Sequence, residues 1–213
     1  MVWNEKLKRN IPFNWANLKV KDCIYHINTG LNPRDNFVLG NGNIRYITVK
    51  NLTTNGTIDF LNCDVIDQNA QKLIHNRSKV SKGDILFASI APLGRCHIVM
   101  ENPIDWEINE SVFSIRPKLE VVTSEYLYMY FISSEFVKKA EHSSTGSVFN
   151  GIRITTLEDM DLIIPKKEVL NLYQTTVEKL FLKKHIIEKE NSELIVLRNY
   201  LLPLLMNGKI TIK

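Results

Sequence analysis

Several features common in other protein classes are missing from this sequence of 213 residues. No apolar run approaches the roughly 20 residues that a membrane-spanning helix needs, and the first residues lack the apolar stretch of a signal peptide. The three cysteines, Cys23, Cys63 and Cys96, are widely spaced and odd in number, which argues against a disulfide framework. We therefore expect a cytoplasmic protein with reduced thiols and no contact with a membrane.

Catalytic motifs are also missing. There is no P-loop, residues 40–42 (Gly-Asn-Gly) lack the third glycine of a dinucleotide site, and the Cys23–His26 spacing lacks the second ligand pair of a zinc site. The Asn/Asp-Pro-Pro-aromatic motif of amino-methyltransferases is absent as well. Asp105 and Glu107 would point to the same side of a strand, but an acidic loop is the commoner meaning of such a pair. We expect no catalytic residue, no metal site and no cofactor in this chain.

Acidic and basic residues balance over most of the chain. Residues 1–165 contain 18 Lys/Arg and 18 Asp/Glu, and residues 166–213 contain 9 and 5, so the net charge of +4 arises from the C-terminal part. Residues 71–83 carry several bases and no acid, whereas residues 101–110 carry four acids and no base. This polarity allows one basic face, although two solvated loops of opposite sign would give the same pattern.

Hydrophobic patterning divides the chain into two parts and indicates an α+β protein. Residues 1–165 form a mostly β domain, in which residues 123–141 have helical spacing and Thr123 is a plausible N-cap. The long helix follows in residues 166–213, with a kink or an end expected near Leu202, before Pro203, and a stop at residues 207–208 (Asn-Gly). The predicted strands are residues 44–49, 57–60, 83–90, 96–100, 112–116, 152–154, 162–164 and a short one near 209–212.

The long helix carries apolar residues at seven-residue spacing. Such a stripe needs a partner helix to cover it, and no second helix of comparable length is predicted in the chain. We interpret the stripe as a dimerisation surface, with packing inside the same chain as the alternative. Its residues are Leu180, Ile187, Leu194, Leu197, Leu201 and Leu204.

Several short segments, taken in order, resemble the DNA specificity subunit of type I restriction–modification systems. Each is weak alone, but their order and spacing cover nearly the whole chain. They are residues 11–15 (Ile-Pro-Phe-Asn-Trp, similar to the family's opening Pro-x-x-Trp), 29–33 (Thr-Gly-Leu-Asn-Pro), 45–52 (Arg-Tyr-Ile-Thr-Val-Lys-Asn-Leu), 82–86 (Lys-Gly-Asp-Ile-Leu), the Gly94 loop, the segment from Thr145-Gly146 to Ile154, Ile164-Pro165, and 197–210, which is similar to the family's closing Leu-Leu-x-x-Leu-x-x-Gly-Lys-Ile.

The resemblance implies a non-catalytic subunit with two target recognition domains, each followed by a long helix, and with the two helices packed antiparallel. Each domain reads one half of a split DNA sequence. Methyltransferase subunits, which carry S-adenosylmethionine, dock on this scaffold, and a restriction and motor subunit that uses ATP and Mg²⁺ joins them. This chain holds one domain (1–165) and one helix (166–213), so it resembles a half subunit, natural or truncated. A symmetric homodimer would then read an interrupted palindrome in double-stranded DNA.

DNA recognition needs cations for the phosphates and polar groups on loops that reach the base edges. The candidates come from polar segments around the β core, and any one of them has an ordinary surface role as its alternative. Tyr25, Phe37 and Tyr46 are possible base-stacking residues, but a core role is the commoner one. The candidates for DNA contact are Arg34, Lys50, Asn51, Lys72, Arg77, Lys79, Lys82, Arg95, Ser144, Thr145, Gly146, Ser147, Asn150 and Arg153.

Two other functions stay open. An adaptor would bind partners through the helix and a non-DNA ligand through the β domain, as the zero net charge of residues 1–165 suggests. Substituting Lys79 and Lys82 by Glu would leave an adaptor unaffected and would weaken a DNA reader. A stand-alone nuclease using Asp105 and Glu107 would instead show magnesium-dependent cleavage that Asp105→Asn abolishes.

Overall fold

The computed structural model describes residues 1–5, 8–144 and 151–210. It contains two compact units, Met1–Gln174 and Thr175–Lys213. The boundary lies inside the last helix, α5 (Lys167–Met206), whose first two turns belong to the first unit. The predicted division at residue 165 lies just before this helix begins.

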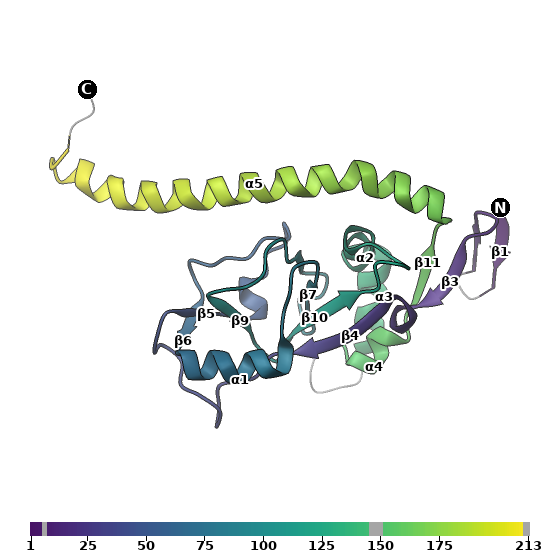
Figure 1. Ribbon diagram of the computed structural model, residues 1–213, viewed down its shortest axis with the longest axis horizontal. Helices are drawn as coiled ribbons and strands as arrows, with labels where there is room; N and C mark the ends of the chain where they lie inside the picture. The colour runs from purple at the N-terminus through teal and green to yellow at the C-terminus, as the bar shows by residue number, and fades with distance from the viewer. Residues whose placement is uncertain (6–7, 145–150, 211–213) are drawn as a thin grey trace. The chain divides into compact units, whose positions relative to one another are not determined.

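The first unit is built on four small sheets (Figure 1). Two sheets have two strands each: β1 (Val2–Asn4) beside β2 (Arg9–Ile11), and β11 (Asp161–Ile164) beside β3 (Ala16–Lys19). The four-stranded sheet has the order β4 (Ile24–Thr29), β10 (Val112–Pro117), β7 (Ile85–Ala88), β8 (Cys96–Ile98). The three-stranded sheet has the order β6 (Asp64–Ile66), β5 (Ile44–Ile47), β9 (Trp106–Ile108). All pairs are antiparallel except β5 with β9. The predicted α+β fold is therefore confirmed.

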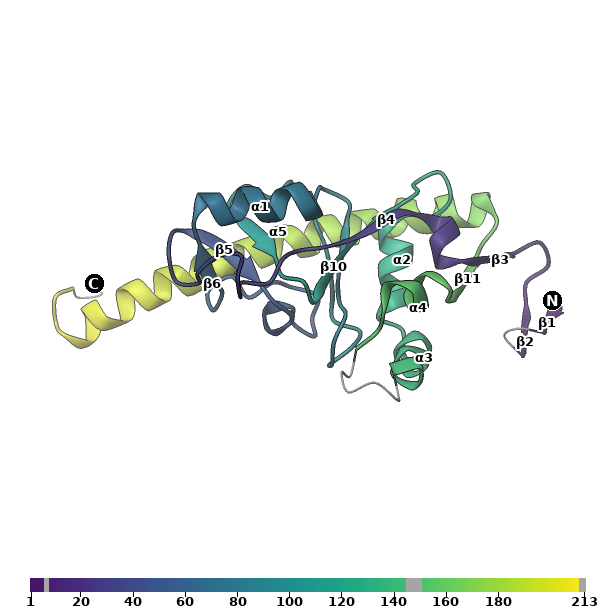
Figure 2. The same ribbon diagram turned by 90° about the horizontal axis from the view of Figure 1, so that it is seen from below.

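Helices cover these sheets within the first unit. They are α1 (Gln68–Ser78), α2 (Ser124–Phe131), α3 (Ser134–Ser144) and α4 (Ile154–Glu158), with two 3₁₀ turns, η1 (Val20–Cys23) and η2 (Val49–Asn51). Figures 1 and 2 show α1 beside β5, β6 and β9, and α2, α3 and α4 near the end of the four-stranded sheet where β11 lies. An aromatic cluster joins the four-stranded sheet to these helices: Phe87 of β7 packs against Phe131 of α2 and Phe136 of α3.

Several predicted elements are confirmed. Strands occur within residues 44–49, 83–90, 96–100, 112–116 and 162–164. The Thr123 side chain caps α2 by accepting a hydrogen bond from the Tyr126 amide. Gly208 has a φ of +65°, and the Lys209 amide bonds back to the Leu204 carbonyl at 2.9 Å, which is the expected left-handed helix end.

Other predicted elements are wrong. The helix expected over residues 123–141 is two helices, since the chain turns at Ile132 and Ser133 and the Ser133 hydroxyl caps the second by accepting from the Phe136 amide. The strand expected at 57–60 is only a single bridge between Leu52 and Ile58, and residue 154 begins α4 and not a strand. Helix α1 was not predicted at all.

The helix α5 also continues beyond the expected point. We expected a kink or an end near Leu202, but the helix runs through Pro203 to Met206. Proline removes one backbone hydrogen bond, while the flanking leucines are strong helix formers, so a last turn forms after it. Residues 211 and 212 of the expected terminal strand lie outside the described residues, and Lys209 and Ile210 form a bend. In the part of the chain that is described, no helix is both long and apolar enough to span a bilayer.

Candidate functional site

The acid-free stretch at residues 71–83 forms a helix and its exit, where a polar loop was expected. Lys72 and Arg77 lie on α1, Lys79 is its C-cap in a left-handed conformation with a φ of 37°, and Lys82 follows in the next turn. All four side chains are exposed, and none has a carboxylate partner among the described residues. They form a group of cations available for an anionic ligand, which we call the α1 cation cluster.

Local chemistry explains why α1 forms here. The Asp67 side chain accepts a hydrogen bond from the Ala70 amide at 2.8 Å and so caps the helix. Ala70 and Ile74 are buried in a cluster with Ile44 and Tyr46 of β5 and Ile66 of β6. The helix therefore presents one face to the core and leaves the opposite face to solvent.

Side-chain bonds hold one end of α1 to the segment before β9 and the other end to β4. Gln71 donates to the Ile104 carbonyl at 3.0 Å, and Asn28 of β4 donates to the Ser78 carbonyl at 3.2 Å. Arg77 reaches the Thr29 hydroxyl at 3.3 Å. The cation cluster thus lies on a fixed support, next to the end of β4.

The exit of α1 is held by a buried ion pair. The Arg116 guanidinium donates through Nε and Nη2 to the two carboxylate oxygens of Asp84, at 2.7 and 2.8 Å, and through Nη2 to the Lys79 carbonyl at 3.2 Å. The Asp84 side chain is only 1% exposed. Hydrogen bonding to Asp84 raises the pKa of Arg116 above its ordinary value, so this cation is committed to the fold.

A second acid lies beneath the middle of α1. The Glu107 carboxylate of β9 is buried, and its Oε1 lies 3.2 Å from Nδ1 of the exposed His75. Burial raises the pKa of Glu107 to about 7. The ring of His75 is thereby oriented by a group inside the protein.

Two predicted DNA-contact residues have structural roles. Asn51 is buried: its side-chain oxygen accepts from the Thr48 amide at 2.9 Å, and its amide donates to the Asp59 and Asn62 carbonyls. Arg95 is half-buried and donates to the Leu52 carbonyl at 3.2 Å. Both side chains organise the segment between residues 48 and 62, so we leave them out of the candidate site.

The remaining predicted residues are dispersed or not described. Arg34 is exposed in a turn, Lys50 is exposed in η2, and Arg153 is the exposed N-cap of α4. Ser144 ends α3. The candidates Thr145, Gly146, Ser147 and Asn150 lie outside the described residues.

The aromatic candidates for base stacking divide into core residues and one exposed residue. Tyr46 is buried, donates to the Leu31 carbonyl at 2.6 Å and packs edge-on against Phe37. Tyr25 is exposed, and its hydroxyl lies 2.9 Å from the Glu120 carboxylate. Core packing is therefore the role of Tyr46 and Phe37.

Asp105 and Glu107 have different partners and form no catalytic pair. Asp105 precedes β9 and pairs with Arg45, whose guanidinium lies over the Phe60 ring. Glu107 faces His75. Over the described residues, no group of three or more His, Cys, Asp or Glu side chains is arranged to hold a metal ion.

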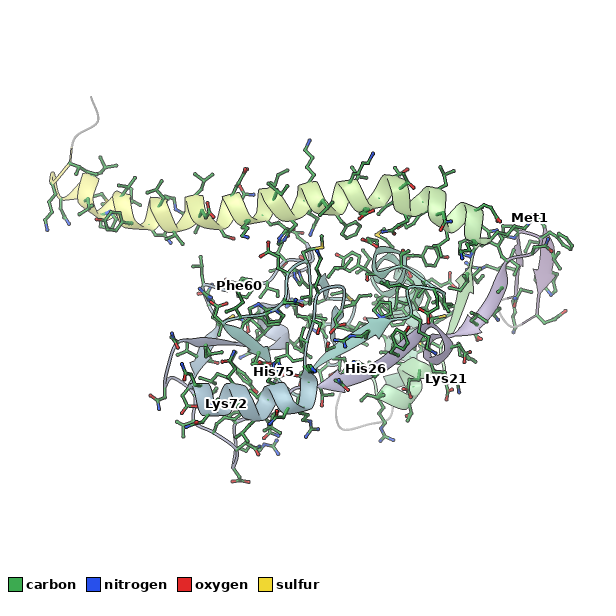
Figure 3. All side chains as sticks on the ribbon, viewed as in Figure 1. Met1, Lys21, His26, Phe60, Lys72 and His75 are labelled. Atoms are coloured by element: carbon green, nitrogen blue, oxygen red, sulfur yellow. The ribbon has the colours of Figure 1, made fainter. Side chains whose placement is uncertain are left out.

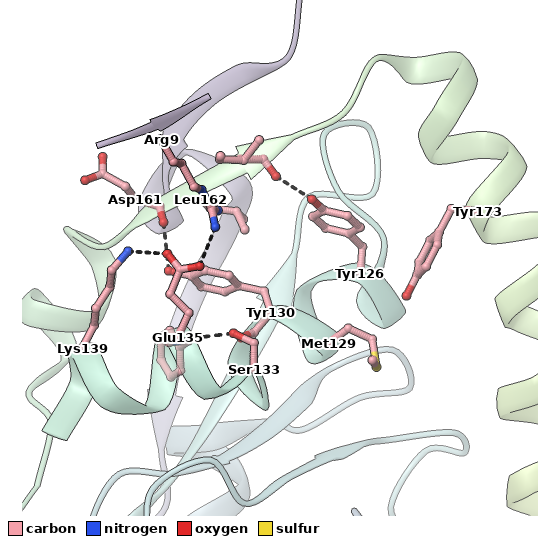
Figure 4. Close-up of a pocket in the computed structure, with 12 residues that line it drawn as sticks. Arg9, Tyr126, Met129, Tyr130, Ser133, Glu135, Lys139, Asp161, Leu162 and Tyr173 are labelled. Atoms are coloured by element: carbon pink, nitrogen blue, oxygen red, sulfur yellow. Dashed lines mark hydrogen bonds and ion pairs between the residues drawn. The ribbon is translucent and has the colours of Figure 1, made fainter. Parts of the chain in front are cut away.

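A pocket of about 370 Å³ lies between α2, α3 and β11 (Figure 4). Its tyrosine hydroxyls bond to strand carbonyls, Tyr126 to Ile163 at 2.7 Å and Tyr130 to Asp161 at 2.9 Å. At its edge Glu135 binds Arg9 at 2.7 Å and Lys139 at 2.8 Å. These contacts fasten the N-terminal hairpin and β11 to the helices, which is a structural role.

The apolar stripe of α5 is open to solvent. Leu180 and Leu194 are 61% and 60% exposed, Leu197 50% and Ile187 44%, while Leu201 and Leu204 are half-buried. Of the helix residues that are described, only Leu170 is buried. A surface of this kind is typical of a helix that packs against a partner.

Sequence comparison relates most of the chain to one family. The model of the type I restriction modification DNA specificity domain matches residues 12–195. The specificity subunit of the type I restriction enzyme MjaIX from Methanocaldococcus jannaschii is 24% identical over 218 residues, which cover 100% of this chain and 48% of that protein. The HindI specificity subunit from Haemophilus influenzae is 29% identical over 114 residues, 51% of this chain and 24% of that protein. The chain therefore spans about half the length of the MjaIX subunit.

Solved structures show the same fold at low identity. The S subunit of a type I restriction–modification system from M. genitalium aligns with a TM-score of 0.57 and 14% identity, over 91% of this chain and 45% of that one. The HsdS subunit from Thermoanaerobacter tengcongensis aligns with a TM-score of 0.53 and 13% identity, over 95% of this chain and 47% of that one.

Proposed function

The chain belongs to the type I restriction–modification DNA specificity family, and from this membership we propose that it reads one half of a split target in double-stranded DNA. The single observation that best supports the proposal is the α1 cation cluster. Four exposed bases on a fixed support, with no carboxylate partner among the described residues, are suited to the phosphate backbone. The balanced charge of residues 1–165 does not oppose this, since many of the other bases are paired with acids.

The proposal includes a scaffold role. The exposed stripe of α5 packs against the helix of a second copy of this chain, and the symmetric dimer binds an interrupted palindrome. Methyltransferase subunits and a restriction subunit assemble on this scaffold in the cytoplasm. The chemistry that needs S-adenosylmethionine, ATP and Mg²⁺ then belongs to those partners, and this chain contributes recognition.

The test is the salt dependence of DNA binding by the full chain. A fluorescent duplex of mixed sequence is titrated by anisotropy between about 50 and 200 mM salt, the range over which phosphate contacts dominate the change in affinity. The variant Lys79→Ala, Lys82→Ala is compared with wild type. We expect weaker binding to every duplex and a slope of log K against log salt that is smaller by about one for each lost phosphate contact.

The control variant is Lys21→Ala, Lys139→Ala, which removes the same net charge from bases paired with Asp159 and Glu135. We expect its salt slope to stay close to that of wild type. Equal losses in both variants would mean that only net charge matters, and salt-independent binding would contradict the assignment of a phosphate-contacting cluster. If neither variant changes binding, the phosphate contacts lie elsewhere on the chain, and if wild type does not bind DNA at all, the adaptor function becomes the better hypothesis.

A further inference from the structure

The exposed face of α1 combines amide and cationic side chains and contains no acid. Its outermost residues are Asn69, Lys72 and Asn76, which repeat every three or four positions and lie opposite the buried Ala70 and Ile74. Gln68 and Leu73 flank them and are also exposed. Figure 3 labels Lys72 on this helix, next to His75.

This composition contributes little to helix stability. Asparagine is among the weaker helix formers, and the helix has no glutamate to form a supporting pair with Lys72 or Arg77 across one turn. Its local stabilisation comes from its two ends: the Asp67 cap, the Lys79 amide bonded to the His75 carbonyl, and the bases of the last turn. The polar face therefore has a composition suited to a ligand more than to the helix itself.

We propose that α1 is the base-reading element of this domain and enters the major groove of the DNA. This inference rests on the proposed function and identifies which element carries out the reading. The major groove accepts an α-helix, the amide of asparagine pairs bidentately with adenine, and lysine binds guanine O6 and N7. Asn69 and Asn76 contact adenines. Lys72 is the member of the α1 cation cluster on this face, and it contacts a guanine between them instead of a phosphate.

The length of α1 sets the spacing of these contacts. Its 11 residues make a helix of about 16 Å at a rise of 1.5 Å per residue. Asn69 and Asn76 are seven residues apart, about 10 Å along the axis, which corresponds to roughly three base pairs at 3.4 Å each. Leu73, which is 50% exposed, lies between them and contacts a thymine methyl group.

The contacts beneath α1 hold it rigidly enough to read bases. The Asp67 and Glu107 carboxylates, which bond to α1, are both occupied, one by the Ala70 amide and one by His75. Glu107 is buried and Asp67 lies at the N-cap, so neither carboxylate is part of the face formed by Asn69, Lys72 and Asn76. At the other end of α1, the hydrogen bond to the Thr29 hydroxyl orients Arg77, which binds the DNA phosphates beside the groove.

The experiment selects target sequences with the full chain from a duplex library that has a randomised central block. Wild type is compared with Asn69→Ala and Asn76→Ala, and each consensus is determined by sequencing. Alanine is the best helix former, so these variants keep the helix. Asn55→Ala, an exposed asparagine in the turn at residues 53–56, is the matched control.

We expect a wild-type half-site with two A·T pairs about three base pairs apart. Asn69→Ala should relax one of them and Asn76→Ala the other, with a loss of discrimination of about tenfold or more at that position only. Asn55→Ala should leave the consensus unchanged. A consensus that is identical in wild type and both α1 variants would overturn the inference.

This design separates the inference from the proposed function. If no enriched sequence emerges even with wild type, the proposed function of the chain fails. If a consensus emerges and the α1 substitutions do not alter it, the chain reads DNA with a different element. If they weaken binding to all sequences equally, α1 contacts phosphates only and the base-reading role is wrong.

Discussion

Asp84 and Arg116 form a two-point ion pair that joins the four-stranded sheet to the exit of α1. Arg116 Nε lies 2.7 Å from Asp84 Oδ1, and Nη2 lies 2.8 Å from Oδ2. Asp84 Oδ2 also accepts hydrogen bonds from the Ser81 amide at 2.8 Å and the Ser114 hydroxyl at 3.2 Å. Arg116 in turn donates to the Lys79 carbonyl, so the pair fixes the backbone that carries the cation cluster.

Removing Asp84 should strongly destabilise the protein. Asp84→Ala leaves the Arg116 charge partly buried without its partner, and the loss of one member of a buried pair costs about 3–5 kcal/mol of unfolding free energy. Urea denaturation followed by circular dichroism measures the change. Asp159→Ala, which breaks the exposed pair with Lys21, should have little effect. Similar losses in both variants would refute a special role for the buried pair.

Burial of Glu107 should make stability depend on pH. Its pKa in the folded protein is raised to about 7 from an ordinary value of 4.5, so the folded state binds the proton more tightly than the unfolded state. The stability gained from this tighter proton binding is complete below about pH 4.5 and is lost as the pH rises through 7. The free energy of unfolding should fall by up to about 3 kcal/mol over this range.

The variant Glu107→Gln should lack this pH dependence. Unfolding free energies are measured in urea from pH 5 to 8: wild type should lose stability toward high pH while the variant does not, so the difference between them should change with pH. Glu120→Gln, at an exposed carboxylate, should follow the wild-type curve. Parallel curves for wild type and Glu107→Gln would show that the carboxyl ionises normally.

Close packing should make Gly30 intolerant of a side chain. A Cβ at this position would lie 1.7 Å from the Ile108 carbonyl oxygen of β9. Gly30→Ala must displace the strand, with an expected loss of about 2–3 kcal/mol or more. Gly40→Ala is the control: its φ is +81° but no atom lies within 4 Å of the added Cβ, so only the backbone strain of about 1 kcal/mol applies. Thermal denaturation should rank the two variants in this order.

The apolar stripe of α5 should control the oligomeric state. Light scattering should give a dimer for wild type and a monomer for Ile187→Asp, Leu194→Asp, because the charges are placed where the partner helix packs. Ser192→Asp, Asn199→Asp adds the same charge on the other side of the helix and should remain dimeric. A monomeric wild type would refute the symmetric dimer and the palindromic target with it.

Patterns of local origin could be predicted from the sequence. The seven-residue spacing from Leu180 to Leu201, the cap at Thr123 and the helix end at Gly208 each depend on residues a few positions apart. Strand composition located β5, β7, β8, β10 and β11 for the same reason, while the other strands were not predicted. The break between α2 and α3 was missed because it depends on the single capping hydroxyl of Ser133 within a continuous helical pattern.

Identifying the candidate site required both the sequence pattern and the tertiary structure. The acid-free charge pattern at residues 71–83 is visible in the sequence, as is an N-cap signal at Asp67, which would have indicated a helix where a loop was expected. Nothing local distinguishes Lys82 from Asn51 or Arg95 as a DNA-contact residue. The burial of Asn51 follows from contacts with Asp59 and Asn62 across a loop.

By itself the sequence determined the α+β class, the long helix with its unpartnered stripe, and the family. Only the tertiary structure decided that α1 lies across β4 and β9, that Glu107 orients His75 and that Arg116 is committed to Asp84. These pairings join residues about 30 positions apart or more. Their formation depends on how the strands pack, and a local pattern carries no information about which distant partner a side chain will meet.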